Sequence, residues 1–231
     1  MEIELTRFVS GGYFITREGN PGWEQLKELL PDRLISLSSH ICPQFSVSWG
    51  WITGNRQAAL DFGVRASQID EFVAWCGTDY REDMDIWSMF YSPVAANRFI
   101  NRFIEDRQGL HIVGAGLPLE LEVANWRWPG ESEGIEKRVE QRLPMAEGGR
   151  TLGFELLRFS HNNFDCSWLC TYLHQDMHRL FGIVPGEFGL IQREVEAQTV
   201  YAWIAEDERK RHADPIIYDY WLLVDYPLDH A

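Results

Sequence analysis

Four side chains that can ligate a metal or act as nucleophiles recur at every fourth position of one segment. They lie in the sequence SHNNFDCSWLCTYLHQDMHRLFG and are Cys166, Cys170, His174 and His178. Asparagine side chains at the start of the segment can cap a helix and Gly182 can end one, so we expect a helix over residues 162–182. Its predicted buried stripe consists of Leu169, Leu173, Met177, Leu180 and Phe181.

The length of such a helix excludes one metal ion bound by all four side chains. Cys166 and His178 would be about 18 Å apart, whereas zinc needs ligands within roughly 2.0 to 2.3 Å. The pair His174 and His178 has the spacing of zinc peptidases, but Gln175 stands where those enzymes carry the glutamate that acts as general base. Packed thiols with histidines at the edge of the buried stripe are therefore preferred, and an enzyme or metal-binding protein that uses His174 and His178 is the alternative.

A reactive thiol is a further hypothesis for this segment. Cys166 would lie in the first helical turn, where the helix dipole lowers the pKa of a thiol, but Asp165 beside it has the opposite effect. One helical turn between Cys166 and Cys170 is a poor geometry for a disulfide. With Cys42 and Cys76 distant in sequence, the cysteines indicate a reduced, cytoplasmic protein for which no cofactor is predicted.

The charge balance bears on the choice of partner. The chain has 35 acidic and 21 basic residues and a formal net charge of −14. This balance disfavours nucleic acid and anionic membrane surfaces, and it suits either a basic protein partner or simple solubility. No apolar run is long enough to span a membrane, and the first residues, MEIEL, lack the features of a secretory signal.

Two segments are predicted to contact a protein partner. The first is the acidic stretch DYREDMD, whose carboxylates are Asp79, Glu82, Asp83 and Asp85. It lacks the glycine and the final glutamate of a calcium-binding EF-hand loop, so a docking surface for a basic partner and a merely solvated loop are the remaining interpretations. The second is the tip formed by Trp126 and Trp128, because exposed tryptophans often dominate binding energies.

Two enzyme-like patterns are weak. The segment LHIVGAG at residues 110–116 resembles the start of a dinucleotide-binding turn, but the third glycine is missing and Pro118 prevents the required helix, so we expect a glycine hairpin. Glu120 and Glu122 would share one face of a returning strand over residues 119–128, about 7 Å apart. Such a pair suits a glycosidase, yet glutamates on the wet side of a strand are common.

The remaining chain predicts an α+β fold with mixed or antiparallel sheets and packed helices. Predicted strands span residues 3–9, 13–16, 45–52, 151–159 and 216–226, and predicted helices span residues 23–30, 67–75, 93–106 and 194–207. The last strand is apolar enough to lie inside a sheet. The polar stretch 129–149 divides the chain into regions 1–128 and 150–231, which form two subdomains or one continuous domain.

One part of the sequence resembles uncharacterised bacterial proteins of toxin-immunity type. The similarity lies in residues 152–204, in the short runs GFELL, SWLC, FGI, GLIQ and YAWI. The resemblance implies a non-enzymatic cytosolic protein that neutralises a toxin by occlusion, and it assigns no site residues. The acidic charge fits such a role, since acidic surfaces steer basic partners. A structural subunit of a homo-oligomeric assembly is a further alternative.

Overall fold

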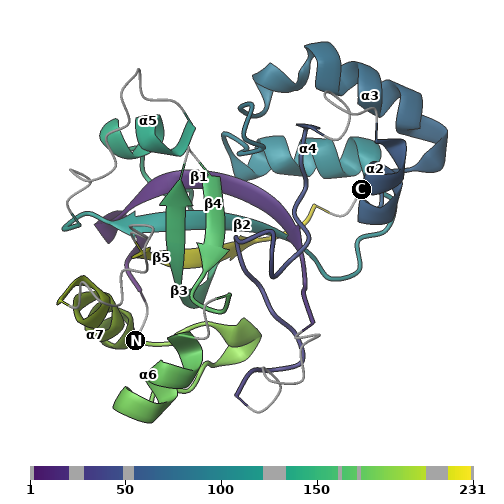
Figure 1. Cartoon of the computed structure of the whole chain (residues 1–231). Helices are drawn as coiled ribbons and strands as arrows, with labels where there is room; N and C mark the ends of the chain where they lie inside the picture. The colour runs from purple at the N-terminus through teal and green to yellow at the C-terminus, as the bar shows by residue number, and fades with distance from the viewer. Residues whose placement is uncertain are drawn as a thin grey trace.

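A curved five-stranded antiparallel sheet runs through the centre of the protein, with helices packed around it (Figure 1). The computed structural model describes residues 3–20, 29–48, 55–121, 134–160, 163–170, 173–206 and 218–229. Its strands are β1 (Phe8–Arg17), β2 (Leu110–Pro118), β3 (Arg150–Ser160), β4 (Asn163–Ser167) and β5 (Tyr218–Tyr226). They are arranged in the order β1-β2-β5-β3-β4, and every neighbouring pair is antiparallel. The predicted α+β class is confirmed, as is the interior position of the last strand.

The first strand is one continuous element where the sequence had predicted two strands joined by a glycine turn. The register of β1 against β2 shifts between Ser10 and Gly12, and Gly12 has a φ of 110°. This left-handed conformation has no steric cost for glycine, so the pair Gly11 and Gly12 forms a bulge within β1 instead of ending it.

The glycine-rich segment 110–116 lies entirely within β2, so the predicted hairpin was wrong. A Cβ atom at Gly114 would lie 2.8 Å from the ring of Tyr226 on β5 and 3.2 Å from the ring of Tyr13 on β1. These positions need glycine because aromatic side chains from both neighbouring strands pack directly on the backbone.

Six α-helices are present in the described residues. They are α2 (Arg56–Phe62), α3 (Ile69–Thr78), α4 (Pro93–Phe103), α5 (Gly134–Glu140), α6 (Leu173–Phe181) and α7 (Glu194–Glu206). Helix α4 begins as predicted, with the Ser92 hydroxyl accepting a hydrogen bond from the Ala95 N–H at 3.1 Å. None of the described helices combines the length and the apolar character needed to cross a membrane.

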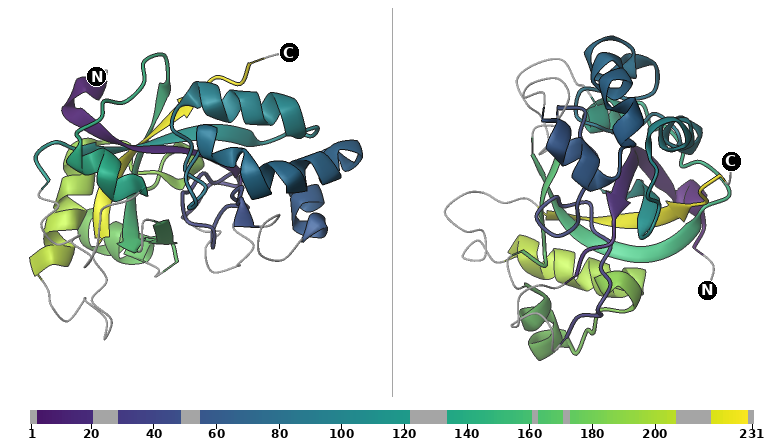
Figure 2. Two further views of the ribbon diagram at one scale, coloured as in Figure 1. Left: turned by 90° about the horizontal axis from the view of Figure 1, so that it is seen from above. Right: turned by 90° about the vertical axis from the view of Figure 1, so that its right-hand side faces the viewer.

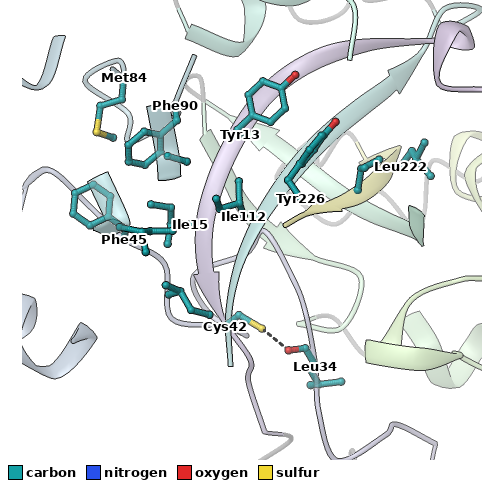
Figure 3. Packing of buried hydrophobic residues seen from close by; sticks show 14 of the residues in the cluster. Tyr13, Ile15, Leu34, Cys42, Phe45, Met84, Phe90, Ile112, Leu222 and Tyr226 are labelled. Atoms are coloured by element: carbon teal, nitrogen blue, oxygen red, sulfur yellow. Dashed lines mark hydrogen bonds between the residues drawn. The ribbon is translucent and has the colours of Figure 1, made fainter. Parts of the chain in front are cut away.

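Both faces of the sheet are buried. On one face Ile15, Ile112 and Leu222 belong to an apolar cluster (Figure 3). The same cluster includes side chains of α2, α3, α4 and α7, and Figure 2 shows the helices around the sheet from two further sides. On the other face Trp221 and Leu223 pack with α5 and with the segment 34–38. Burial on both sides explains why these strands read as continuous apolar runs in the sequence.

The region from Phe45 contributes to the core without forming the predicted strand. Within residues 45–48, the described part of that prediction, no strand is present. Phe45 and Val47 are nevertheless buried, and the Phe45 ring lies 4.3 Å from the ring of Phe99 on α4. The alternation of apolar residues therefore correctly indicated that Phe45 and Val47 are buried, but it did not mean that the segment pairs with a strand of the sheet.

The polar stretch 129–149 connects parts of the chain that share one sheet. Strands β1 and β2 come from region 1–128, and β3, β4 and β5 come from region 150–231. Helix α5 lies within the polar stretch and packs on β1. The predicted helix over residues 23–30 falls mainly outside the described residues.

Candidate functional site

The cysteine–histidine segment is not one helix, and this prediction was wrong in its first half. Residues 163–167 form β4, which pairs with β3, and α6 begins only at Leu173. Phe164 is buried on β4, with its ring edge-on to Trp221 at 4.8 Å. Sheet pairing and burial of this phenylalanine outweigh the local helix signals.

The two histidines lie in different surroundings although both are on α6. His174 is fully buried, its ring lies 6.4 Å from Trp168 in an edge-on orientation, and burial lowers its pKa. His178 is exposed, as are Leu180 and Phe181, which had been predicted to be buried. In the described part of the chain, no three histidine, cysteine or acidic side chains are arranged to hold a metal. The metal pair His174 and His178 therefore remains only a prediction.

A turn between β4 and α6 brings the two thiols of this segment together. The Cys170 N–H donates to the Ser167 carbonyl at 2.9 Å, which closes the turn, and the Cys166 thiol donates to the same carbonyl at 3.6 Å, so both cysteines lie around Ser167. Both cysteines are half-buried thiols and not part of a disulfide. The helical separation that disfavoured a bridge between them is absent.

Cys170 is surrounded by hydrogen-bond donors. The Ser167 N–H lies 3.4 Å from its sulfur, and the Ser38 hydroxyl lies 3.7 Å from it. The Cys166 thiol does most to lower the pKa of Cys170; burial opposes it, and Ser167, Ser38 and His40 lower the pKa further, to about 5. These groups favour the thiolate form of Cys170.

Beside these thiols, Glu155 of β3 is completely buried. Its carboxyl group accepts hydrogen bonds from the hydroxyls of Ser36 at 2.5 Å and Ser167 at 2.6 Å, and from the Leu37 N–H at 3.1 Å. Burial raises its pKa to about 7 against the effect of these three donors, and the charge of Cys170 contributes to the rise. Ser167 links the two groups, because its hydroxyl contacts the carboxyl and its N–H contacts the thiol.

The other two cysteines have no such surroundings. Cys42 and Cys76 are both fully buried. The Cys42 thiol donates to the Leu34 carbonyl at 3.3 Å (Figure 3), and burial raises its pKa to about 12. The four cysteines therefore divide into two that are buried and two that are partly accessible, and of the latter Cys170 has a lowered pKa.

The predicted acidic loop contains two exposed and two engaged carboxylates. Asp79 and Glu82 are exposed, on either side of the turn that buries Tyr80. Asp83 forms an ion pair with Arg98 on α4. Asp79 and Glu82 can thus contact a partner as they stand, whereas Asp83 would first have to leave its ion pair with Arg98.

Asp85 shapes a rigid turn that follows the acidic loop. Its side chain accepts hydrogen bonds from the N–H groups of Trp87 and Met89, both at 2.9 Å. Ser88 in the same turn has a φ of 66°. This arrangement places Trp87 at the apex of a short loop that bridges Met84 and Phe90.

Apolar side chains gather on the surface at this turn. Ile86, Trp87 and Tyr91 are 39%, 38% and 42% exposed. They line a groove of about 520 Å³ together with Arg81, Lys137 and Arg138, and we call it the Trp87 groove. Trp87 also lines a second hollow of about 350 Å³ next to Phe14 and Phe45. The indole therefore stands between two concave surfaces.

Arg138 lies at the wall of the Trp87 groove. Its guanidinium packs over the Tyr13 ring at 5.7 Å and donates to the Ser10 hydroxyl and the Tyr91 carbonyl. Burial lowers its pKa, and its buried Nε atom has no hydrogen-bond partner among the described residues. The Arg138 side chain is thus held in the groove wall by Tyr13, Ser10 and Tyr91.

Three other predicted site residues lie outside the part of the chain that the structure describes. Trp126 and Trp128 lie outside the described residues, and so does Glu122 of the predicted carboxylate pair. Its predicted partner Glu120 is exposed in a turn that follows β2.

Trp87 and Glu155 were not among the residues predicted from the sequence. Trp87 directly follows the acidic loop, and a tryptophan in so polar a stretch is a signal for an exposed aromatic side chain. Glu155 interrupts an otherwise apolar strand, a position at which a charged residue must be buried with partners.

Comparison with known proteins gives one short similarity. No protein-family model matches the chain, and no solved structure matches it. The glucose-6-phosphate isomerase 1 of Chromohalobacter salexigens is 37% identical over 57 residues, which are 25% of this chain and 10% of that enzyme. So small a part of the isomerase carries no statement about activity here.

Proposed function

We propose that this protein binds a basic protein through the surface around Trp87, and that the partner is a toxin which this binding occludes. The observation that carries the proposal is the exposure of three apolar side chains, Ile86, Trp87 and Tyr91, beside the Trp87 groove. Exposed tryptophan and tyrosine next to a hollow are typical anchors of protein interfaces.

The groove suits an apolar side chain of the partner and the backbone next to it. Its volume of about 520 Å³ exceeds that of a single large side chain, and Trp87, Ile86 and Met89 supply apolar walls. A backbone carbonyl of the partner would accept a hydrogen bond from Lys137 or Arg138 at the groove wall. The Asx turn at Asp85 fixes the backbone at Trp87 before binding, which reduces the backbone entropy lost on association.

The net charge of the chain and the carboxylates ahead of the Trp87 turn support a basic partner, although the groove itself is lined by Arg81, Lys137 and Arg138. The chain has a net charge of −14, and Asp79 and Glu82 are exposed in the segment that leads into the Trp87 turn. Acidic groups at the rim of an interface accelerate encounter with a positively charged protein. The resemblance of residues 152–204 to toxin-immunity proteins adds the class of partner, and a cytosolic location belongs to the same proposal.

The first test is capture of the tagged protein from cells of its source, followed by affinity measurements with the captured partner. We expect Trp87→Ala to weaken binding by about 30-fold, the effect of losing a hot spot worth about 2 kcal/mol. The matched control is Val195→Ala, which removes a 60% exposed apolar side chain on α7. An empty capture, or equal affinity of Trp87→Ala and wild type, would refute the proposal.

The second test addresses charge. The double variant Asp79→Asn/Glu82→Gln should slow association and flatten its dependence on salt, because rim charges act mainly on the association rate. The control Glu4→Gln/Asp32→Asn removes the same charge from exposed positions on other segments. If both double variants slowed association equally, the effect would come from the net charge of the protein and not from the carboxylates at this rim.

A further inference from the structure

Two thiols held by one turn, one of them approached by hydrogen-bond donors, form a site that protein binding does not use. The Cys166 thiol, at the end of β4, donates to the Ser167 carbonyl at 3.6 Å, and the Ser167 N–H donates to the Cys170 sulfur at 3.4 Å, so both sulfurs lie against the backbone of the same residue. Neither thiol lines the Trp87 groove. We propose that Cys170 is a nucleophilic thiol that reduces hydroperoxides and then forms a disulfide with Cys166.

The first step needs a thiolate, and the turn is built to hold one. The Ser167 N–H and the Ser38 hydroxyl approach the Cys170 sulfur from two different segments of the chain. Both segments are fixed by Glu155, whose carboxyl group accepts hydrogen bonds from Ser167 and from Ser36, while the Ser36 hydroxyl accepts from the Ser38 N–H at 2.9 Å. The donors are therefore held in place by a buried network and do not depend on mobile surface side chains.

In the proposed reaction, the Cys170 thiolate attacks one oxygen of a hydroperoxide, ROOH. A sulfur–oxygen bond forms and the oxygen–oxygen bond breaks. The departing alkoxide takes up a proton equivalent to the one that the Cys170 thiol had released, so that Cys170 becomes a sulfenic acid and ROH leaves. The sulfur loses two electrons and the peroxide gains them.

Cys166 completes the reaction because the turn at Ser167 holds its sulfur close to the attacked sulfur. Its sulfur displaces the hydroxyl of the Cys170 sulfenic acid, the sulfur–sulfur bond forms, and the hydroxyl leaves as water with the proton of the Cys166 thiol. The sum is two thiols and ROOH giving one disulfide, ROH and water. A thiol reductant returns the pair to its starting state by exchange.

The rate of alkylation as a function of pH tests the first half of the proposal on the intact protein. With a pKa of about 5, Cys170 is almost wholly thiolate at pH 6, whereas an ordinary thiol is ionised to less than about 1%. The lower basicity of the sulfur offsets part of this gain, so iodoacetamide should modify Cys170 about tenfold faster than an ordinary thiol at pH 6. Its rate should then stay level up to pH 8, where that of an ordinary thiol rises about tenfold per pH unit.

Peptide mass spectrometry separates the four cysteines in the same experiment. Cys42 and Cys76 are internal controls, since both are buried and should stay unmodified while the protein is folded. The variant Ser38→Ala should move the alkylation profile of Cys170 to higher pH. A Cys170 rate that rises tenfold per pH unit between pH 6 and 8 would overturn the proposal.

Treatment with hydrogen peroxide or cumene hydroperoxide tests the second half. Wild type should form the Cys166–Cys170 disulfide at about one equivalent of peroxide, and dithiothreitol should reverse it. Cys166→Ser should stop at the sulfenic acid, which dimedone traps, and Cys170→Ser should not react. Circular dichroism of each variant shows that it is folded. Failure of folded wild type to form the disulfide would refute the proposal, and it would leave the binding role of the Trp87 surface untouched.

Discussion

Replacing Glu155 by glutamine should remove a dependence of stability on pH that arises from this one carboxyl group. The substitution preserves size and hydrogen bonding: an amide oxygen can accept from the Leu37 N–H, and an amide nitrogen can donate to the Ser36 and Ser167 hydroxyls once these rotate. Wild type and variant then differ mainly in the ability to ionise at this buried position.

The size of the effect follows from the position of the pKa. An ordinary glutamate has a pKa of 4.5, and burial raises that of Glu155 to about 7. Each pH unit between these values corresponds to about 1.4 kcal/mol, so the contribution over the whole interval is about 3 kcal/mol.

The direction is fixed by which state binds the proton. Between pH 4.5 and 7 the folded protein keeps Glu155 protonated while the unfolded chain does not, so a rise in pH favours unfolding. The stabilising contribution is therefore complete below pH 4.5, falls through the interval, and is level above pH 7. Glutamine cannot ionise and should show no such fall.

Urea denaturation at half-unit steps from pH 4.5 to pH 8 measures this difference. The free energy of unfolding of wild type minus that of Glu155→Gln should fall by about 3 kcal/mol between pH 4.5 and 7 and then remain constant. Glu147→Gln, which changes an exposed carboxyl group, serves as the control and should run parallel to wild type. Parallel curves for wild type and Glu155→Gln would show that the carboxyl group is not held protonated, and the account of this network would fail.

Two further predictions concern stability. His111 lies 3.1 Å from Asp225 and 3.0 Å from Glu18. Burial lowers its pKa, but the hydrogen bonds to these two carboxylates outweigh burial and raise the pKa above 6.5. The stabilising effect of His111 should therefore be complete below pH 6.5 and be lost as the pH rises through the folded-state pKa. His111→Gln should abolish this loss in denaturation curves above pH 6.5, and an unchanged slope would contradict it. Ser92→Ala removes the N-cap of α4 and should lower the free energy of unfolding by about 1 kcal/mol in urea, whereas a change within error would show that the cap contributes nothing.

The elements that sequence patterns predicted well are those in which local signals and burial agree. Helix α4 has a serine cap followed by proline, and its Phe99 and Phe103 are buried as the helical spacing indicates. Strands β3 and β5 are apolar enough to be recognised without knowledge of their neighbours. In these elements the local conformational propensity of the residues agrees with the burial of their apolar side chains.

The parts that escaped prediction depend on contacts between distant segments. Strand β4 exists because it pairs with β3, and Asn162, Asn163 and Gly182 instead suggested one long helix. The surroundings of Cys170 include the Ser38 hydroxyl, from a segment far away in the sequence. That segment is held by the hydrogen bond from Ser36 to Glu155, which spans 119 positions of the chain. Local spacing carries no information about such distant partners. The sequence therefore identified the two cysteines as candidates but could not predict how they are arranged in space.

The position of β5 in the sheet has a consequence for how the protein is made. This strand lies between β2 and β3 and joins the pair β1–β2 to the pair β3–β4. It follows the other four strands in the chain, so a ribosome that has synthesised those four has produced two separate ribbons, each with an unpaired edge that β5 will later cover. Until then the nascent chain exposes strand edges open to pairing with other chains, and binding of chaperones would be most valuable in that interval.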